Sequence, residues 1–134
     1  MRDDIANTSP LKTILEYCDL ILDAMDFFGH DEEDFFDNRF YQVSCSFSLF
    51  QIGEAVKRMP FIVTDDHPDV DWSGIARLRD IIAHQYENVE LPIIWSIITE
   101  QIPVLKQQCE KILRLVEDRK ERERRKRTAD GGIP

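Results

Sequence analysis

The chain has 134 residues and a formal net charge of −9. This length fits one domain with a single core, and no run of about 18 apolar residues predicts a membrane span. Cys18, Cys45 and Cys109 are widely spaced within helical patterns, which is typical of buried thiols in a cytosolic protein and excludes a disulfide framework. We therefore expect a cytoplasmic protein without a signal peptide.

The first predicted helix begins after Thr8 with Pro10 in its first turn and runs to about Phe28, where Gly29 ends it. A long second helix is predicted from Asp31 to about Met59. Its predicted core stripe consists of Phe36, Phe40, Val43, Phe47 and Phe50, continued by Ala55 and Met59. The helix contains more aromatic residues than its core needs, so core packing and a dimer seam on the surplus side both remain open as interpretations. The aromatic residues are Phe35, Phe36, Phe40, Tyr41, Phe47 and Phe50.

Residues 61–70 are predicted to form a loop, after which Asp71 caps a third helix from about Trp72 to Tyr86. The last helix begins near Pro92, and Pro103 in its interior is expected to kink it. The sequence thus predicts an all-α, up-down helical bundle of four to five helices over residues 1–117. Residues 118–134 are expected to form a separate, basic and flexible tail.

Four chemically active side chains are concentrated in the third helix, where residues 79–86 read RDIIAHQY. At about 100° per residue, Asp80 and His84 share one surface, opposite the buried stripe. Arg79 and Tyr86 form a second stripe at the edge of the core face. The imidazole of His84 is therefore predicted to point away from its own core, toward solvent or another subunit. Ordinary roles remain open, namely a solvated histidine, a helix-surface ion pair and an aromatic residue at the edge of the core.

This segment matches the pattern R-x4-H-x-Y and resembles the HEPN superfamily, specifically HepT, the toxin of HEPN–MNT toxin–antitoxin pairs. Other segments resemble the family in the same order, over roughly residues 10–113. They are the IGEA segment Ile52-Gly53-Glu54-Ala55, Asp71-Trp72 followed by Ile75, and Trp95, Ile98 and Ile102-Pro103-Val104-Leu105.

The resemblance implies a homodimer in which two such motifs meet at a shared cleft and cleave RNA without a metal or other cofactor. By position, Arg79 and His84 would be the catalytic pair and Asp80 an accessory catalytic residue. Tyr86 would be the modification site, to which an MNT-type nucleotidyltransferase antitoxin transfers AMP. The implied function is that of a type VII toxin acting on mRNA or tRNA.

The residue types suit this chemistry. RNA carries its own nucleophile, the 2′-hydroxyl, an imidazole exchanges protons near neutral pH, and a guanidinium binds two phosphate oxygens. The expected products are a 2′,3′-cyclic phosphate and a 5′-hydroxyl. Asp80 stands where the family often has asparagine. A non-catalytic HEPN domain that binds nucleotide or a nucleotidyltransferase is therefore the alternative, and an interaction domain with an accidental motif is the third.

Charge is distributed unevenly along the chain. Residues 1–110 contain eight basic and 21 acidic side chains, whereas residues 111–127 contain nine basic and four acidic ones. Because phosphate contacts supply most non-specific affinity for nucleic acid, an acidic body opposes RNA binding. Either the Arg79 groups and basic tails meet the substrate locally, or the acidic face serves a basic surface on the antitoxin. The basic segment could also be a solvated helix end.

Overall fold

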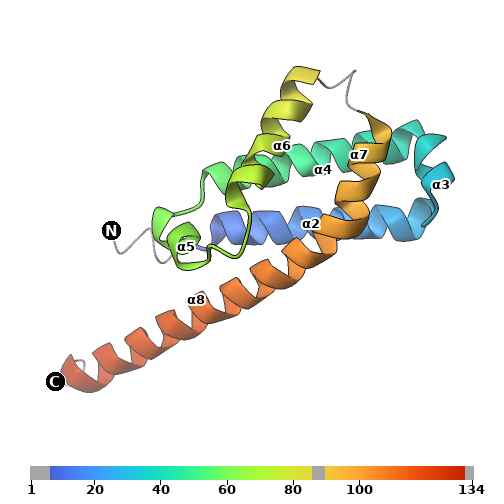
Figure 1. The fold of residues 1–134 in the computed structure, drawn as a ribbon. Helices are drawn as coiled ribbons and strands as arrows, with labels where there is room; N and C mark the ends of the chain where they lie inside the picture. Colours follow the sequence, from blue (N-terminus) through green and yellow to red (C-terminus); the bar gives the residue numbers. More distant parts are fainter. Residues whose placement is uncertain (1–6, 86–89, 132–134) are drawn as a thin grey trace.

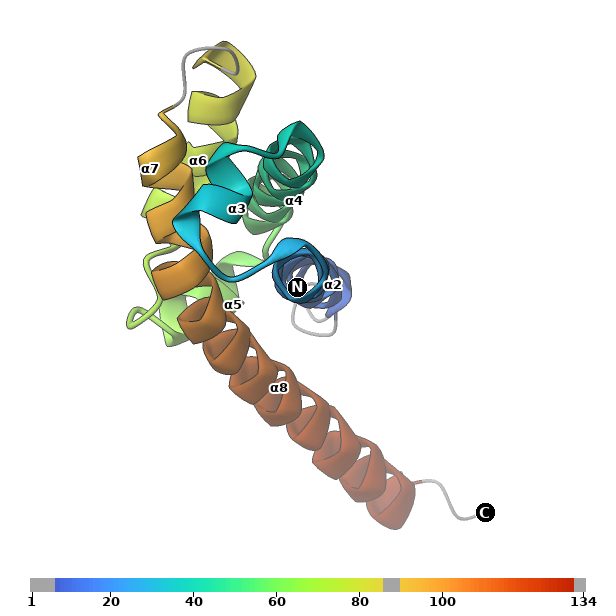
Figure 2. The ribbon, with the colours of Figure 1, turned by 90° about the vertical axis from the view of Figure 1, so that its right-hand side faces the viewer.

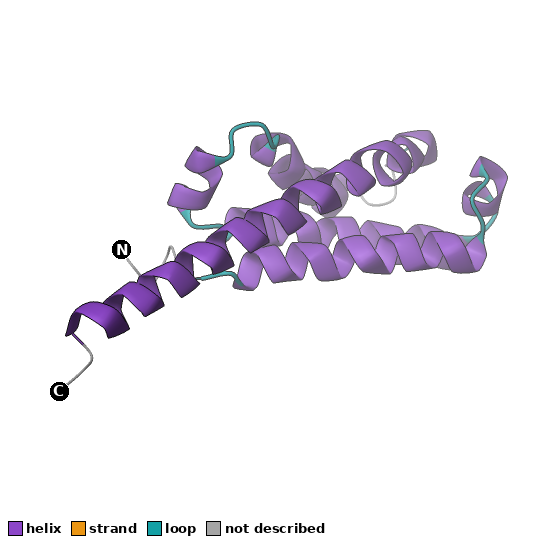
Figure 3. Ribbon diagram, turned by 90° about the horizontal axis from the view of Figure 1, so that it is seen from below, coloured by secondary structure: helices purple, strands orange, loops and turns teal. Residues whose placement is uncertain are grey.

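The computed structural model describes residues 7–85 and 90–131, and its regular elements in these ranges are all helices (Figures 1 and 3). The long elements are α2, α4, α6 and the continuous series α7, η2 and α8, which confirms the predicted all-α bundle. The bounds are α2 (Ser9–Phe28), α3 (Glu32–Phe36), α4 (Arg39–Lys57), α5 (Phe61–Asp66), α6 (Trp72–Gln85), α7 (Leu91–Ser96), η2 (Ile97–Gln101) and α8 (Ile102–Gly131).

Helix α4 is the centre of the bundle. It packs along α2 on one side and against α6 on the other, while α8 packs against α2. Figures 1 and 2 show α2 and α4 side by side, with α6 crossing α4 steeply. The interior contains aliphatic, aromatic and thiol side chains that are fully shielded from solvent, among them Leu11, Ile14, Cys18, Ile21, Tyr41, Cys45, Leu49, Ile52, Ile98 and Cys109.

The first helix ends where the sequence predicts. Gly29 has a φ of +130°, a region that side chains with a Cβ rarely enter, and its N–H donates to the carbonyl of Met25 at 2.9 Å. The hydroxyl of Tyr41 donates to the carbonyl of Gly29 at 3.0 Å. This bond joins the turn after α2 to the first turns of α4.

The single helix predicted from Asp31 to Met59 is wrong, because the chain breaks after α3. Asp31 does cap a helix, in a capping box with Asp34. Asn38 then accepts a hydrogen bond from the N–H of Tyr41 at 3.2 Å and so begins α4 afresh. An asparagine side chain that satisfies a free N–H competes with helix continuation.

The predicted core stripe of this segment is wrong at Phe40, Val43 and Phe47, which are exposed, whereas Phe36 and Phe50 are half-buried against the core. The side chains of Phe40 and Phe47 are 80% and 53% exposed, whereas Tyr41 and Leu49 are buried. Ala55 and Met59 are buried as predicted. Helix α4 thus has two apolar faces, and the one with smaller side chains packs inward because α2 and α6 both approach it closely. Core packing therefore does not account for the outward aromatic residues.

The segment predicted as a loop contains the short helix α5. The indole of Trp72 donates to the carbonyl of His67 at 2.9 Å, which ties this connection to α6. Asp71 accepts a hydrogen bond from the N–H of Gly74 at 3.1 Å and confirms the predicted cap of α6.

The irregularity predicted at Pro103 takes the form of the π-helical turn η2. The N–H of Ile102 donates to the carbonyl of Ile97, five residues earlier. A proline ring collides with the carbonyl four residues before it, here that of Thr99, and a widened turn relieves that collision. The chain changes direction between α7 and α8 (Figure 1).

Helix α8 continues through residue 117 to Gly131, so residues 118–131 of the predicted tail prolong the last helix. Whether they are flexible stays a prediction. Cys18, Cys45 and Cys109 are buried and free, as predicted. Within residues 7–85 and 90–131, no helix combines the length and the apolar character that crossing a membrane requires.

Candidate active site

The candidate site lies where α6 crosses α4. A Cβ placed on Gly53 would lie 2.6 Å from the Cβ of Arg79 and 3.0 Å from its backbone nitrogen. Side-chain carbons do not approach so closely, so only glycine allows α6 to lie this near α4. The glycine of the IGEA segment therefore fixes where the backbone of Arg79 sits.

The guanidinium of Arg79 is held from two sides. Its Nε donates to Glu54 of α4, and its Nη1 donates to Asp80 at 3.4 Å. The guanidinium carbon lies 5.2 Å from the ring centroid of Phe50, within cation–π range. The hydrogen bond that Arg79 donates to Glu54 raises the pKa of Arg79 above its already high value. The group is therefore a permanently charged, oriented cation.

The third nitrogen of this guanidinium, Nη2, has no partner among the described residues. The side chain of Arg79 is 31% exposed. A guanidinium that is held through Nε and Nη1 and keeps Nη2 without a partner among the described residues is suited to hold an anionic oxygen.

Asp80 faces α4, and its charge is compensated there. Its Oδ1 accepts a hydrogen bond from Nζ of Lys57 at 2.7 Å as well as the longer one from Arg79. The hydrogen bond from Lys57, followed by the charge of Lys57 and the contact with Arg79, holds the pKa of Asp80 below its usual value. The extra negative charge at the position after the motif arginine is thus balanced by Lys57.

The other two predicted residues are placed only in part. His84 lies in the last turn of α6, one turn beyond Asp80, but its side chain is outside the described part of the structure. Tyr86 lies outside the described residues altogether. The structure thus brings together Arg79 and Asp80, and their relation to His84 and Tyr86 remains the prediction from sequence.

Sequence analysis gave three neighbours of Arg79 no role in the site, namely Phe50, Glu54 and Lys57. Glu54 carried a usable signal, because a carboxylate between Gly53 and Ala55 in an apolar helix needs a partner. Its partner lies 25 residues away on another helix, and helical spacing alone does not identify it.

An apolar hollow of about 320 Å³ adjoins the site. Val43, Phe47 and Phe50 of α4 line it together with Ile82 and Ala83 of α6. Ile82 is buried, and Ala83 is exposed. Because Phe50 also contacts Arg79, the hollow connects the cation to the outward aromatic face of α4.

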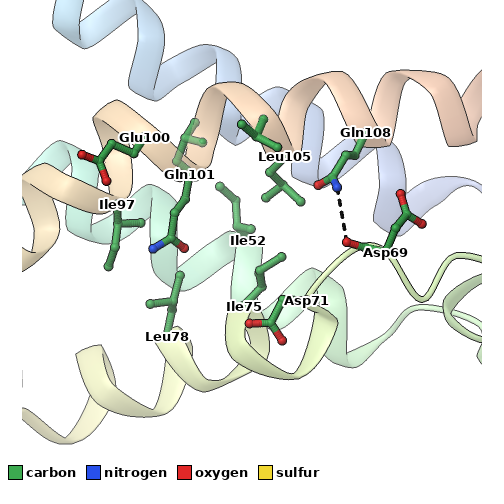
Figure 4. A pocket seen from close by; sticks show the side chains of 12 residues that line it. Ile52, Asp69, Asp71, Ile75, Leu78, Ile97, Glu100, Gln101, Leu105 and Gln108 are labelled. Carbon is green, nitrogen blue, oxygen red and sulfur yellow. Dashed lines mark hydrogen bonds between the residues drawn. The ribbon is translucent and has the colours of Figure 1, made fainter.

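A second cavity, of about 280 Å³, lies between α6 and the η2–α8 segment (Figure 4). Its wall is apolar, with Ile52 and Leu105 inside, and carboxylates such as Asp69 and Asp71 stand at its edge. No basic side chain lines it, so it is a poor receptor for phosphate. Nowhere in the described part of the chain do three histidine, cysteine or carboxylate side chains gather as a metal site.

Comparison with known proteins agrees with the resemblance seen in the sequence. A model of the family described as "Ribonuclease HepT-like" matches residues 14–112. The chain is 36% identical over 103 residues to "Putative RNase TTE0752" of Caldanaerobacter subterraneus, covering 77% of this chain and 90% of that protein. It is 33% identical over 112 residues to "Putative RNase MJ1216" of Methanocaldococcus jannaschii, covering 83% and 90%.

A third relative carries the family name itself. "Probable ribonuclease HepT" of Thermococcus cleftensis is 36% identical over 80 residues, which cover 60% of this chain and 73% of that protein. Among solved structures none matches this chain. The matched residues include the whole α4–α6 crossing and its oriented arginine, and the chain belongs to the HepT-like ribonuclease family.

Proposed function

We propose that this chain is a metal-independent endoribonuclease and the toxin component of a type VII (HEPN–MNT) toxin–antitoxin pair. The observation that carries the proposal is the guanidinium of Arg79. Glu54 and Asp80 hold it by hydrogen bonds, and Nη2 has no partner among the described residues. In a member of a ribonuclease family, an oriented guanidinium with an unpartnered Nη2 is suited to bind the phosphate oxygens of RNA.

In the proposed reaction, the 2′-hydroxyl oxygen attacks the adjacent phosphorus while the bond from phosphorus to the 5′ oxygen breaks. The imidazole of His84 accepts the proton of the attacking hydroxyl. Arg79 stabilises the charge that develops on the non-bridging oxygens. The corresponding imidazole of a second copy donates a proton to the leaving 5′ oxygen. The products are a 2′,3′-cyclic phosphate and a 5′-hydroxyl.

Cleavage of tRNA or total RNA in EDTA by the purified protein tests this proposal. His84→Ala and Arg79→Ala are expected to leave the RNA intact. Arg77→Ala is the matched control, because Arg77 is an exposed arginine on the same helix, and it should cut like wild type. A substrate with deoxyribose at the cleaved position should resist cleavage. Equal survival of RNA with wild type and with His84→Ala would contradict the proposal.

The proposed homodimer uses the aromatic face, which we define as Leu20, Phe40, Val43 and Phe47. These side chains are exposed, line a depression of about 580 Å³, and continue through the apolar hollow to Ala83 of α6. Exposed apolar surface of this kind marks an interaction site. A second copy bound there would bring the two α6 helices near one another.

Sedimentation of the wild-type protein tests the dimer. Phe40→Glu combined with Phe47→Glu places charge in the aromatic face and is expected to yield monomers that have lost RNA cleavage. Phe61→Glu is the control, because Phe61 is an equally exposed aromatic residue on α5. If the wild-type protein is a monomer and cleaves RNA, the proposed homodimer is wrong and the proposed nuclease activity still holds.

The proposed partner is a nucleotidyltransferase of the MNT type, which transfers AMP from ATP to the hydroxyl of Tyr86 and releases pyrophosphate. The adduct adds bulk and negative charge beside Arg79 and obstructs RNA. Mass spectrometry after incubation with such an enzyme and ATP should place one AMP on Tyr86. Tyr86→Phe should remain unmodified and escape neutralisation. A non-catalytic domain would instead form the complex without any toxicity.

A further inference from the structure

The far end of α8 differs from the rest of the molecule in position and in charge. The family match ends at residue 112, yet α8 continues as one helix to Gly131. Figures 1 and 2 show this end projecting away from the bundle. No residue between 117 and 129 is buried. At 1.5 Å per residue, the projecting part extends about 20 Å. We call residues 117–131 the α8 arm.

Part of the arm's charge stabilises the helix itself. Glu121 pairs with Arg124 at 2.6 Å and with Arg125 at 3.1 Å, and Arg119 pairs with Glu123 at 3.6 Å. Pairs three and four residues apart support a helix that has no tertiary contacts. Basic residues near its carboxyl end also interact favourably with the helix dipole. The arm is therefore a helix that can stand in solvent.

The remaining cations of the arm have no such role. Lys120, Arg122, Lys126 and Arg127 pair with no carboxylate among the side chains that the structure describes. Arg122 and Lys126 are four residues apart, and Lys120 and Arg127 are seven apart, so two pairs of cations each share a side of the helix. The arm thus offers two rows of cations that form no ion pair with the described carboxylates.

The rest of the chain is acidic. Residues 1–110 contain 21 acidic and eight basic side chains, and two of those basic groups, Arg79 and Lys57, are already bound to Glu54 and Asp80. An RNA chain drawn to Arg79 gains little non-specific affinity from such a body.

We propose that the α8 arm is a phosphate-binding arm that holds RNA outside the catalytic site, through Lys120, Arg122, Lys126 and Arg127. The proposal rests on the proposed ribonuclease function, since RNA is the polyanion this protein would meet. A phosphodiester chain presents closely and regularly spaced negative charge, which matches cations repeated along one helix. The carboxylates of another protein copy are the competing partner.

The test is the salt dependence of RNA binding by the full chain. The probe is a fluorescent single-stranded RNA with 2′-O-methyl groups, which keeps its phosphates but has no nucleophile, in EDTA between 50 and 200 mM salt. The arm variant combines Lys120→Gln, Arg122→Gln, Lys126→Gln and Arg127→Gln, because glutamine preserves helix propensity. The control combines Lys12→Gln, Arg39→Gln, Arg58→Gln and Arg77→Gln, which removes four exposed cations of the body.

Four lost phosphate contacts should reduce the slope of log K against log salt by about 3, taking about 0.7 per contact on a single strand. Wild-type affinity should therefore fall about 50-fold more than that of the arm variant over this fourfold change in salt. The control should keep a slope close to the wild-type one. Circular dichroism should report unchanged helix content in both variants.

The proposal would be overturned if the arm variant bound RNA with the affinity and salt slope of the wild type. It would also be overturned if the control variant lost as much affinity and slope as the arm variant. An altered sedimentation coefficient with unchanged RNA binding would assign the arm to protein contacts instead. Cleavage of natural RNA, measured separately, tells the two proposals apart. A wild-type protein that binds RNA through the arm but never cuts it refutes only the nuclease. A protein that cuts RNA and binds it equally without these cations refutes only the arm.

Discussion

Gly53 of α4 stands against the Cβ of Arg79 of α6, and no side chain fits between them. This contact links a packing requirement to the chemistry of the site, because the same crossing lets Glu54 reach the guanidinium. The lack of a side chain on Gly53 lets the backbone of Arg79 approach α4. The carboxylate of Glu54 then holds the guanidinium.

Gly53→Ala should separate the two helices. The added methyl lies 2.6 Å from the Cβ of Arg79, and overpacking of this kind costs about 1–3 kcal/mol of folding free energy. Urea unfolding should show this loss, and RNA cleavage should fall with it because Arg79 moves. Gln107→Ala, at an exposed site on α8, should change neither measurement. An unaltered unfolding midpoint for Gly53→Ala would contradict the close packing.

Glu54→Gln tests whether the carboxylate orients Arg79. Glutamine keeps an acceptor oxygen but loses the charge-assisted hydrogen bond. A misplaced positioning group costs about 100-fold in rate, so the cleavage rate should fall by about one to two orders of magnitude with little change in unfolding. Glu54→Asp, which keeps the charge on a shorter side chain, should restore only part of the rate. If Glu54→Gln cleaves RNA at the wild-type rate, the carboxylate has no positioning role.

The pairing of Asp80 with Lys57 should appear in the pH dependence of stability. The folded pKa of Asp80 is lowered, chiefly by the hydrogen bond from Lys57. The stabilisation is therefore present above the unfolded value of about 3.9 and is lost as pH falls through the lower folded pKa. The unfolding midpoints of wild type and Asp80→Asn should differ near neutral pH and converge in acid. Asp65→Asn, at an exposed site, is the control.

The three thiols should be inert in the folded protein. Burial raises the pKa of Cys18, Cys45 and Cys109 to about 12, so the reactive thiolate is scarce at pH 8. A thiol reagent such as dithionitrobenzoate should label them only as the protein unfolds, and at once in denaturant. Rapid labelling of any of the three in the native protein would show that its part of the core opens readily.

Local sequence signals predicted much of this molecule correctly. Gly29 and Asp71 mark a helix end and a helix start through bonds that reach only three or four residues along the chain. Pro103 marked the irregular turn because its ring acts on its own helix. The motif arginine and the family resemblance could also be identified from the sequence, since R-x4-H-x-Y is a pattern of close neighbours on one helix.

The sequence did not predict which face of α4 is buried. Its sequence contains two apolar stripes, one with Phe40 and Phe47 and one with Tyr41 and Leu49, and both satisfy helical periodicity. The approach of α2 and α6 decides which stripe turns inward, and that is a tertiary event. The hydrogen bond from Arg79 to Glu54 also depends on tertiary packing, because it joins residues 25 positions apart. Sequence determines interactions within a few residues along the chain, whereas the choice between equivalent faces depends on which helices pack against them.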